Sequence, residues 1–230
     1  MAQKILNRDF VLAFFAQFTF TSVFYILVPT LPIYLSRLGS KEAEIGVLVG
    51  IFFLSSLISR PLVGRALLRI REKTFMIAGT LLFAFTSVAY LLAPPFWPLL
   101  IVRVFQGIGY GFFLTAVYTL VANISPEGRL GQSFSYFYLA FNLSGALAPS
   151  LGMLVINHFG FTHLFLICLG LSLCSLFISN KLGRRQVVPW RFRPPRMFSF
   201  LAVKLFHRPS LIPFPCSSGE LWPPFSLSMQ

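Results

Sequence analysis

The sequence predicts an all-α polytopic membrane protein with six transmembrane helices. Of its 230 residues, 56% are hydrophobic and only 11% are charged, whereas a soluble domain carries roughly 25% charged residues. The apolar residues also gather in stretches of about 20, the length that a helix needs to cross the hydrocarbon core of a bilayer. These observations exclude a disordered chain, a disulfide scaffold and an ordinary cytosolic enzyme.

Six apolar segments follow one another, separated by short polar or turn-forming joints. Helices are expected in all six, because a spanning segment must satisfy its backbone hydrogen bonds internally and the alternation typical of barrel strands is missing. Short joints imply that neighbouring spans run antiparallel in a bundle. The predicted spans are residues 10–35, 45–67, 74–92, 97–123, 132–157 and 161–180.

The net charge of +13 is distributed as a topology signal. Cytoplasmic loops of membrane proteins carry an excess of Lys and Arg. With six spans, only Arg37 and Lys41 among the loop residues fall on the side opposite to the other basic residues. Both termini are therefore predicted to be cytoplasmic, in an integral protein of a bacterial inner (cell) membrane. No basic stripe interleaves with aromatic residues, so no nucleic-acid partner is expected.

Three stretches have distinctive patterns: residues 60–73 after the second span, residues 103–111 in the fourth span and residues 144–152 in the fifth. Their order and spacing resemble the amino-terminal half of a major facilitator superfamily (MFS) transporter, over about residues 8 to 185. The resemblance implies an MFS-like amino-terminal bundle. It also implies transport by alternating access, usually coupled to a proton gradient, and a complete family member would continue with six further spans.

The first stretch resembles the family's cytoplasmic loop pattern G-x-x-x-D-R-x-G-R-[RK]. Leu68 stands at the position of the usual acid, which in the family pairs across the cytoplasmic face and helps to gate alternation. This departure puts the gating network in question, and a plain basic cytoplasmic loop is the alternative interpretation. The stretch contains the matching Gly64, Arg69 and Lys73, the departures Arg71 and Glu72, and Arg65.

The second stretch matches the family pattern R-x-x-Q-G-x-G with Arg103 and Gln106. A charge inside a span costs several kcal/mol, so an intramembrane Arg indicates a function. The resemblance implies that Arg103 faces the interior and takes part in proton coupling or contact with a substrate anion. The alternative is an Arg that reaches the membrane interface with its long side chain. Small residues that permit close helix contact follow it: Gly107, Gly109 and Gly111.

The third stretch resembles the G-x-x-x-G-P-x-x-G-G motif that is typical of antiporters in the family. Ser144 and Ala148 replace two of the glycines, and Pro149 and Gly152 match. With Gly145, these small residues would narrow the groove against a neighbouring helix, and proline allows a bend. Ordinary helix packing is the alternative interpretation.

Polar side chains within the spans are the candidates for a central cavity. Gln17, Thr21 and Tyr25 recur at i, i+4 and i+8 in the first span, and Tyr110 and Asn142 lie in the fourth and fifth. In the family, the first and fourth spans line a cavity near the bilayer midplane. The alternative is hydrogen bonding between helices without a ligand. No Asp or Glu lies deep within a span, so this half has no obvious proton-carrying carboxylate.

The composition changes after residues 1–185, which form the predicted six-span half. Residues 186–230 are basic and rich in proline, without a sustained apolar run. Two interpretations remain open. The codons can be chosen so that a displaced frame encodes a segment resembling the seventh span, which favours a frameshift product. The other interpretation is a natural basic cytoplasmic tail on anionic lipid.

Two functions from different classes follow. The first is an exporter-like, ion (proton)-coupled transporter of a small solute, truncated to half. The second is a six-span membrane protein or inactive fragment that transports nothing. The expected partners are the lipid bilayer, a small-molecule substrate, and a second copy of the chain or a missing carboxy-terminal half. No nucleophile–base set, metal cluster or phosphate loop is visible, so neither an enzyme activity nor a metal or cofactor is expected.

Overall fold

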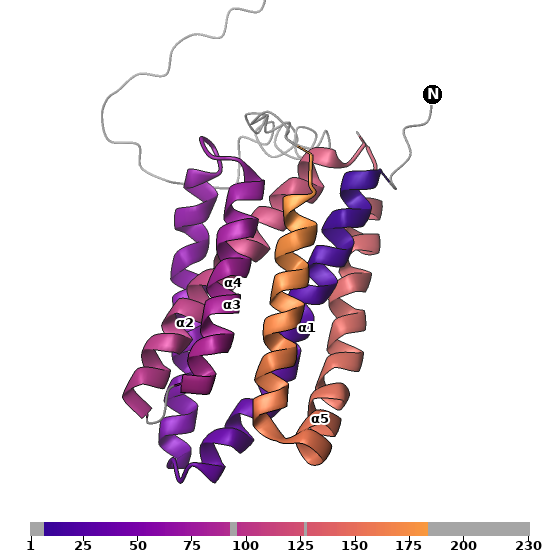
Figure 1. The fold of residues 1–230 in the computed structure, drawn as a ribbon. Coiled ribbons are helices and arrows are strands. Elements are labelled where there is room, and N and C mark those ends of the chain that lie inside the picture. Colours follow the sequence, from indigo (N-terminus) through magenta and orange to yellow (C-terminus); the bar gives the residue numbers. More distant parts are fainter. Residues whose placement is uncertain (1–6, 93–95, 127, 184–230) are drawn as a thin grey trace, which may run out of the picture. The chain divides into compact units, whose positions relative to one another are not determined.

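The computed structural model describes residues 7–92, 96–126 and 128–183, and within them every regular element is an α-helix. Each helix is long and apolar enough to cross a membrane. The expectation of an all-helical membrane protein is therefore confirmed, while the tail at 186–230 lies outside the described residues. The helices are α1 (Arg8–Arg37), α2 (Glu42–Ala66), α3 (Glu72–Leu92), α4 (Phe96–Ile124) and α5 (Leu130–Asn180) (Figure 1).

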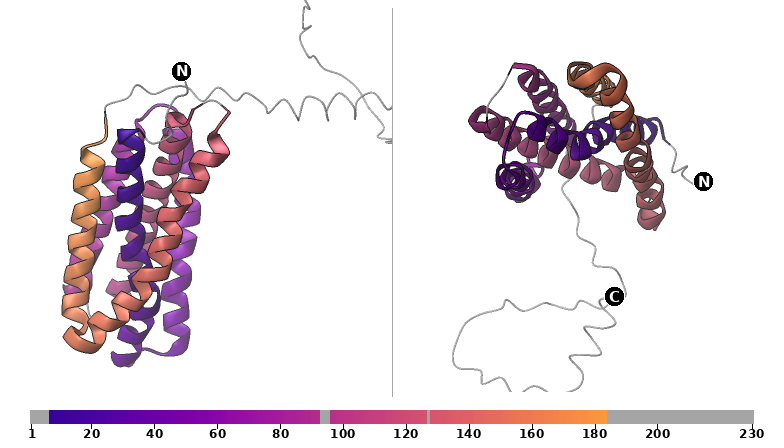
Figure 2. Two further views of the ribbon diagram at one scale, coloured as in Figure 1. Left: turned by 90° about the vertical axis from the view of Figure 1, so that its right-hand side faces the viewer. Right: turned by 90° about the horizontal axis from the view of Figure 1, so that it is seen from below.

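The number of helices differs from the prediction, because the two spans expected at 132–157 and 161–180 belong to the single 51-residue element α5. Gly160 interrupts it with φ 82° and ψ −179°. The two arms of α5 on either side of Gly160 run in opposite directions (Figures 1 and 2). The residues between the two predicted spans are helical up to Gly160, and the chain turns at Gly160.

We expect Gly160→Ala to destabilise the protein by about 1–3 kcal/mol, because a residue with a Cβ is strained in this region of backbone space. The matched control is Gly170→Ala in the second arm, where an added Cβ meets no atom within 4 Å and the backbone is helical. Thermal unfolding of the purified chain in detergent micelles measures the difference. Equal midpoints for the two variants would contradict the assigned turn.

The first joint shows why helices begin and end where they do. Gly39 has φ 81° and ends α1, and the Ser40 N–H donates to the Leu35 carbonyl at 3.1 Å. At the start of α2, the Lys41 N–H donates to Glu44 Oε2 at 3.0 Å. These bonds satisfy backbone groups that a helix end leaves without intrahelical partners. The turn residues thus position α2 antiparallel to α1.

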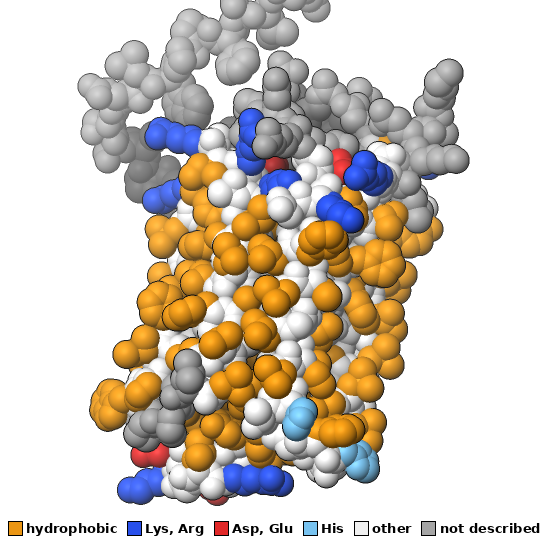
Figure 3. Space-filling view, in the orientation of Figure 1, with side chains coloured by type: hydrophobic (Ala, Val, Ile, Leu, Met, Phe, Trp, Pro, Cys, Tyr) orange, Lys and Arg blue, Asp and Glu red, His pale blue; other side chains and the backbone are white. Residues whose placement is uncertain are grey.

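The packing is that of a membrane bundle. The main contacts join α1 to α5, α4 to both α2 and α3, and α3 to α5. Apolar side chains cover the middle of the surface, while Lys and Arg gather at its ends (Figure 3). Bilayer lipid accounts for such an exposed apolar band, which a soluble protein of this size would not carry. One row of exposed leucines follows the first arm of α5: Leu139, Leu143, Leu147, Leu151 and Leu154.

Candidate functional site

Arg103 lies inside the bundle, with only 6% of its surface exposed. Its Nη1 donates a 2.8 Å hydrogen bond to Gln106 Oε1, and the Tyr90 hydroxyl on α3 donates to the same oxygen at 2.7 Å. The guanidinium carbon lies 5.4 Å from the ring centroid of Phe52 on α2. We call these four residues the Arg103 cluster. It joins α2, α3 and α4 inside the bundle.

Two of the three helices, α3 and α4, bring Arg103, Gln106 and Tyr90 together. Arg103 and Gln106 are three residues apart on α4, so they share a face of the helix. Tyr90 reaches them because α3 and α4 run antiparallel and pack together (Figure 1). Tyr90 was not among the predicted site residues. A tyrosine near the Arg103 end of the preceding span is the signal that could have identified it.

A small cavity of ≈ 50 Å³ adjoins Arg103 and Gln106, between α1, α2 and α4. Arg103 Nε is buried and has no hydrogen-bond partner among the described residues. The cavity is large enough for a water molecule but far below the roughly 300–1,000 Å³ of sites for drug-sized ligands. In this conformation the Arg103 cluster can hold a small polar group, not a whole solute.

The three glycines of α4 lie at its closest contacts with other helices. A Cβ at Gly107 would overlap the Phe52 carbonyl oxygen and Ser55 Oγ, and one at Gly111 would overlap Ser59 Oγ. A Cβ at Gly109 would lie 2.9 Å from Leu82 Cβ on α3. The backbones of α2 and α4 therefore approach each other closely beside the Arg103 cluster, which brings Phe52 within reach of Arg103.

The polar residues of α1 divide between two environments. Gln17 and Thr21 are fully buried. The Thr21 hydroxyl lies 2.7 Å from Ser144 Oγ on α5 and also donates to the Gln17 carbonyl at 2.7 Å, whereas neither side-chain amide atom of Gln17 has a partner among the described residues. The half-buried Tyr25 packs its ring 5.3 Å from that of Phe141. Thr21 thus connects α1 to α5 through an interhelical hydrogen bond.

The small residues of α5 admit these α1 side chains. A Cβ at Gly145 would lie 3.1 Å from Tyr25 Cζ, and one at Gly152 would lie 3.2 Å from Ile26 Cγ2. Pro149 lies between these glycines within the helix. The stretch therefore forms the groove that receives α1.

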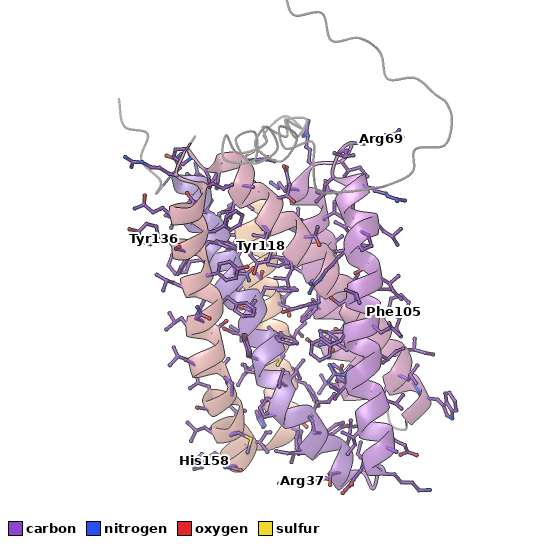
Figure 4. The ribbon with its side chains drawn as sticks, turned by 180° about the vertical axis from the view of Figure 1, so that it is seen from behind. Arg37, Arg69, Phe105, Tyr118, Tyr136 and His158 are labelled. Carbon is purple, nitrogen blue, oxygen red and sulfur yellow. The ribbon has the colours of Figure 1, made fainter. Side chains whose placement is uncertain are left out.

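Four tyrosines connect α1, α4 and the first arm of α5, and we call them the tyrosine face: Tyr25, Tyr110, Tyr118 and Tyr138. The rings of Tyr118 and Tyr138 lie 5.7 Å apart. Tyr110 packs on Phe24 at 4.7 Å and on Phe52 at 5.4 Å. Tyr118 lies well inside the outline of the bundle, whereas Tyr136 lies at its outer edge (Figure 4).

Asn142 follows Tyr138 by one helical turn and is exposed. It lies apart from the Arg103 cluster. The sequence proposed it together with Tyr25 and Tyr110 as a cavity residue, and the structure places it on α5 beside the tyrosine face.

The predicted gating stretch is only partly held by other elements. Lys73 Nζ donates to the carbonyls of Asn180 and, at 3.0 Å, of Leu182, at the end of α5. Glu72 Oε1 accepts a 2.6 Å hydrogen bond from Asn123 Nδ2 at the end of α4. Lys73 and Glu72 therefore tie the start of α3 to two helix ends.

The remaining residues of that stretch are on the surface. Gly64, Arg65 and Arg69 are exposed, a Cβ at Gly64 would meet no atom within 4 Å, and Arg69 projects from one end of the bundle (Figure 4). Neither arginine forms a salt bridge with another residue in the described ranges.

Comparison with known proteins identifies the family. The sequence profile of the Major Facilitator Superfamily matches residues 13–228, which is most of the chain and extends into the tail. The chain is 28% identical over 147 residues to the quinolone resistance protein NorA of Staphylococcus aureus, covering 64% of this chain and 38% of NorA. It is also 28% identical over 163 residues to an MFS-type transporter of Methanocaldococcus jannaschii, covering 70% and 42% of the two chains.

The fold has relatives of the same kind. A POT family transporter crystallised with a thioalcohol-conjugated peptide matches with a TM-score of 0.68 at 18% identity, over 86% of this chain and 44% of that one. The chain thus spans about two-fifths of the length of the relatives it matches. These findings confirm the resemblance seen in the sequence and the expectation that the protein is not an enzyme. The chain belongs to the Major Facilitator Superfamily, and it is an integral membrane protein.

Proposed function

We propose that residues 1–185 form the six-crossing amino-terminal half of an exporter of small solutes that works by alternating access and is coupled to a proton gradient. The likeness to the quinolone resistance protein NorA favours export, and quinolones are therefore the first solutes to test. The observation that carries the proposal is the buried Arg103, because burying a charge in a span is costly and indicates a function.

The chemistry of the Arg103 cluster supports this role. Gln106 and Tyr90 orient the guanidinium through one shared oxygen, while Arg103 Nε stays without a partner beside the small cavity. A guanidinium held in this way presents a fixed positive charge to an anion or to a carboxylate that gains and loses a proton. Arg103 is then the residue at which solute binding or proton movement is linked to the packing of α2, α3 and α4.

The topology belongs to the proposal as well. With Gly160 as the turn between two crossings, the five helices provide six passages through the bilayer. Among the Lys and Arg that the structure describes near the ends of the bundle, only Arg37 and Lys41 then lie opposite the end where α1 begins. The positive-inside rule makes the first end cytoplasmic, in a bacterial inner membrane.

A second half or a second copy of this chain is the proposed partner. Its site is a row of exposed residues that we call the open face of α2: Gly46, Gly50, Phe53, Arg60 and Gly64. A Cβ at any of the three glycines would meet no atom within 4 Å, so nothing in the described chain uses their small size. Small residues on a membrane helix allow another helix to approach closely.

Flux measurements test the transporter proposal. The chain is reconstituted in vesicles of phosphatidylethanolamine and phosphatidylglycerol, and uptake of a quinolone and a panel of uncharged solutes is followed under an imposed proton gradient. We expect gradient-driven flux that Arg103→Ala lowers by a factor of about 100 or more, corresponding to about 3 kcal/mol of lost stabilisation. Arg8→Ala, an exposed basic residue at the start of α1, is the charge control and should leave the flux unchanged.

Two results would count against the proposal. Flux that is equal in the wild type and in Arg103→Ala would remove Arg103 from the mechanism. A folded wild-type chain without flux for any solute of the panel would favour the second function, that of a six-span membrane protein that transports nothing.

A further inference from the structure

The buried guanidinium of Arg103 has no carboxylate partner in the part of the chain that the structure describes. Its Nη1 contacts the neutral amide of Gln106, and its Nε is buried without a hydrogen-bond partner there. Only 6% of the surface of Arg103 is exposed. A charge in a membrane span is normally paired, because burying it without a counter-charge is costly. The charge of Arg103 therefore calls for an anion that residues 7–92, 96–126 and 128–183 do not supply.

The acidic residues of the neighbouring helices lie far from the Arg103 cluster along the helix axes. On α2, Glu44 precedes Phe52 by eight residues, or about 12 Å. On α3, Glu72 precedes Tyr90 by 18 residues, or about 27 Å. The helix that carries Arg103, α4, contains no Asp or Glu. These carboxylates thus stay near helix starts, while Arg103 lies inside the bundle.

The cavity of ≈ 50 Å³ beside Arg103 has a polar part that consists of hydrogen-bond donors. Arg103 contributes its unpartnered Nε–H. Gln106 uses its Oε1 to accept from Arg103 and Tyr90, so its amide N–H groups are what it can still offer. The other lining residues are apolar: Phe24, Leu27, Val28, Val49, Phe52 and Phe53. A lining that donates but does not accept suits a ligand that only accepts, which is the property of an anion.

The size of the cavity limits this anion to a few heavy atoms. A water molecule needs about 10–15 Å³ of such volume, and a drug-sized ligand needs several hundred. Apolar walls also strengthen the attraction between opposite charges, because the local dielectric constant is low. We propose that the cavity binds a small monovalent anion such as chloride as the counter-ion of Arg103. This inference rests on the function proposed for Arg103 and deepens it, because it specifies the class of ligand that the guanidinium recognises.

Thermal unfolding of the full chain in micelles of an uncharged detergent tests the site. Sodium chloride is compared with sodium gluconate at equal ionic strength, since gluconate is also monovalent but too large for the cavity. We expect chloride at about ten times its Kd to raise the midpoint of the wild type by about 3–6 °C relative to gluconate. Arg103→Met should lose this shift. Arg8→Gln, which removes an exposed positive charge at the start of α1, should keep it.

A pair of substitutions at the half-buried Val49 tests the cavity while Arg103 stays in place. Val49→Phe fills the cavity and should lose the chloride shift, whereas Val49→Ala enlarges it and should keep the shift. This pair also decides the matter if Arg103→Met does not fold. Equal shifts in Val49→Phe and Val49→Ala would overturn the site.

Two further outcomes would overturn the anion site. The first is a wild type that chloride stabilises no more than gluconate does, and the second is a shift of equal size in the wild type and in Arg103→Met. Neither outcome decides the transport function, which is read separately. Flux that depends on Arg103 in chloride-free gluconate buffer would leave transport standing without the anion site. A chloride shift that depends on Arg103, in a chain without flux, would leave the anion site standing without transport.

Discussion

Gly107→Ala is expected to lower the thermal stability of the protein strongly and to separate α2 from α4. The added Cβ would overlap the backbone carbonyl oxygen of Phe52 as well as the Ser55 hydroxyl. A side chain can rotate away from such an overlap, but a carbonyl within a helix can move only with the helix. Overpacking of a close contact costs about 1–3 kcal/mol, and the upper end applies when backbone must shift. Unfolding of the purified chain in detergent micelles measures the loss.

Two further glycine substitutions, with different amounts of space around the added Cβ, test this prediction by comparing the stability of the variants. Gly50→Ala on α2 is the matched control, because its Cβ would meet no atom within 4 Å, and alanine favours a helix by about 1 kcal/mol over glycine. Gly145→Ala should fall between the two, since its Cβ would lie 3.1 Å from the end of the Tyr25 side chain. A Gly107→Ala variant as stable as Gly50→Ala would refute the close α2–α4 contact.

Gln106→Leu is the second substitution with a large expected effect. Its Oε1 accepts hydrogen bonds from both Arg103 and Tyr90, so the change leaves a buried guanidinium without the acceptor that the structure gives it. A hydrogen bond to a charged group contributes about 1.5–3 kcal/mol, so we expect a loss of that size. Tyr90→Phe deletes only one hydrogen bond to the same oxygen and should cost about 1 kcal/mol. Thermal or denaturant unfolding in micelles separates these magnitudes.

The double variant Arg103→Met/Gln106→Leu provides the control for this effect. Because it removes the charge together with its acceptor, it should recover much of the stability that Gln106→Leu loses, as when a buried ion pair is replaced by apolar residues. The two residues are in contact, so their effects should not add. If the two single losses add in the double variant, the hydrogen bond between Arg103 and Gln106 does not determine stability.

Most of the helices could be predicted from the sequence. The spans at 10–35, 45–67, 74–92 and 97–123 correspond to α1–α4 within a few residues. They could be predicted because the thickness of the bilayer sets the length of an apolar segment that crosses it, and charged residues mark the ends of each segment. The joint predicted after residue 157 is instead helical up to the turn at Gly160. Polar residues such as Asn157 and His158 are equally acceptable at a membrane interface as part of a helix.

The neighbours of each side chain were harder to predict. Arg103 and Gln106 could be paired because they are three residues apart, but Tyr90 required knowing which side of α3 faces α4. A helix that is apolar all round lacks the polar face that reveals its orientation in a soluble protein.

The turn at Gly160 has a practical consequence for anyone who wishes to map this protein with antibodies or proteases. A reversal centred on one glycine leaves very little chain that an antibody can bind or a protease can cleave. An epitope tag inserted there would separate the two arms of α5. The connection between α1 and α2 contains residues 38–41, and both Arg37 just before it and Lys41 within it are exposed. That connection is therefore the better position for a label, and the tip of α5 should stay intact.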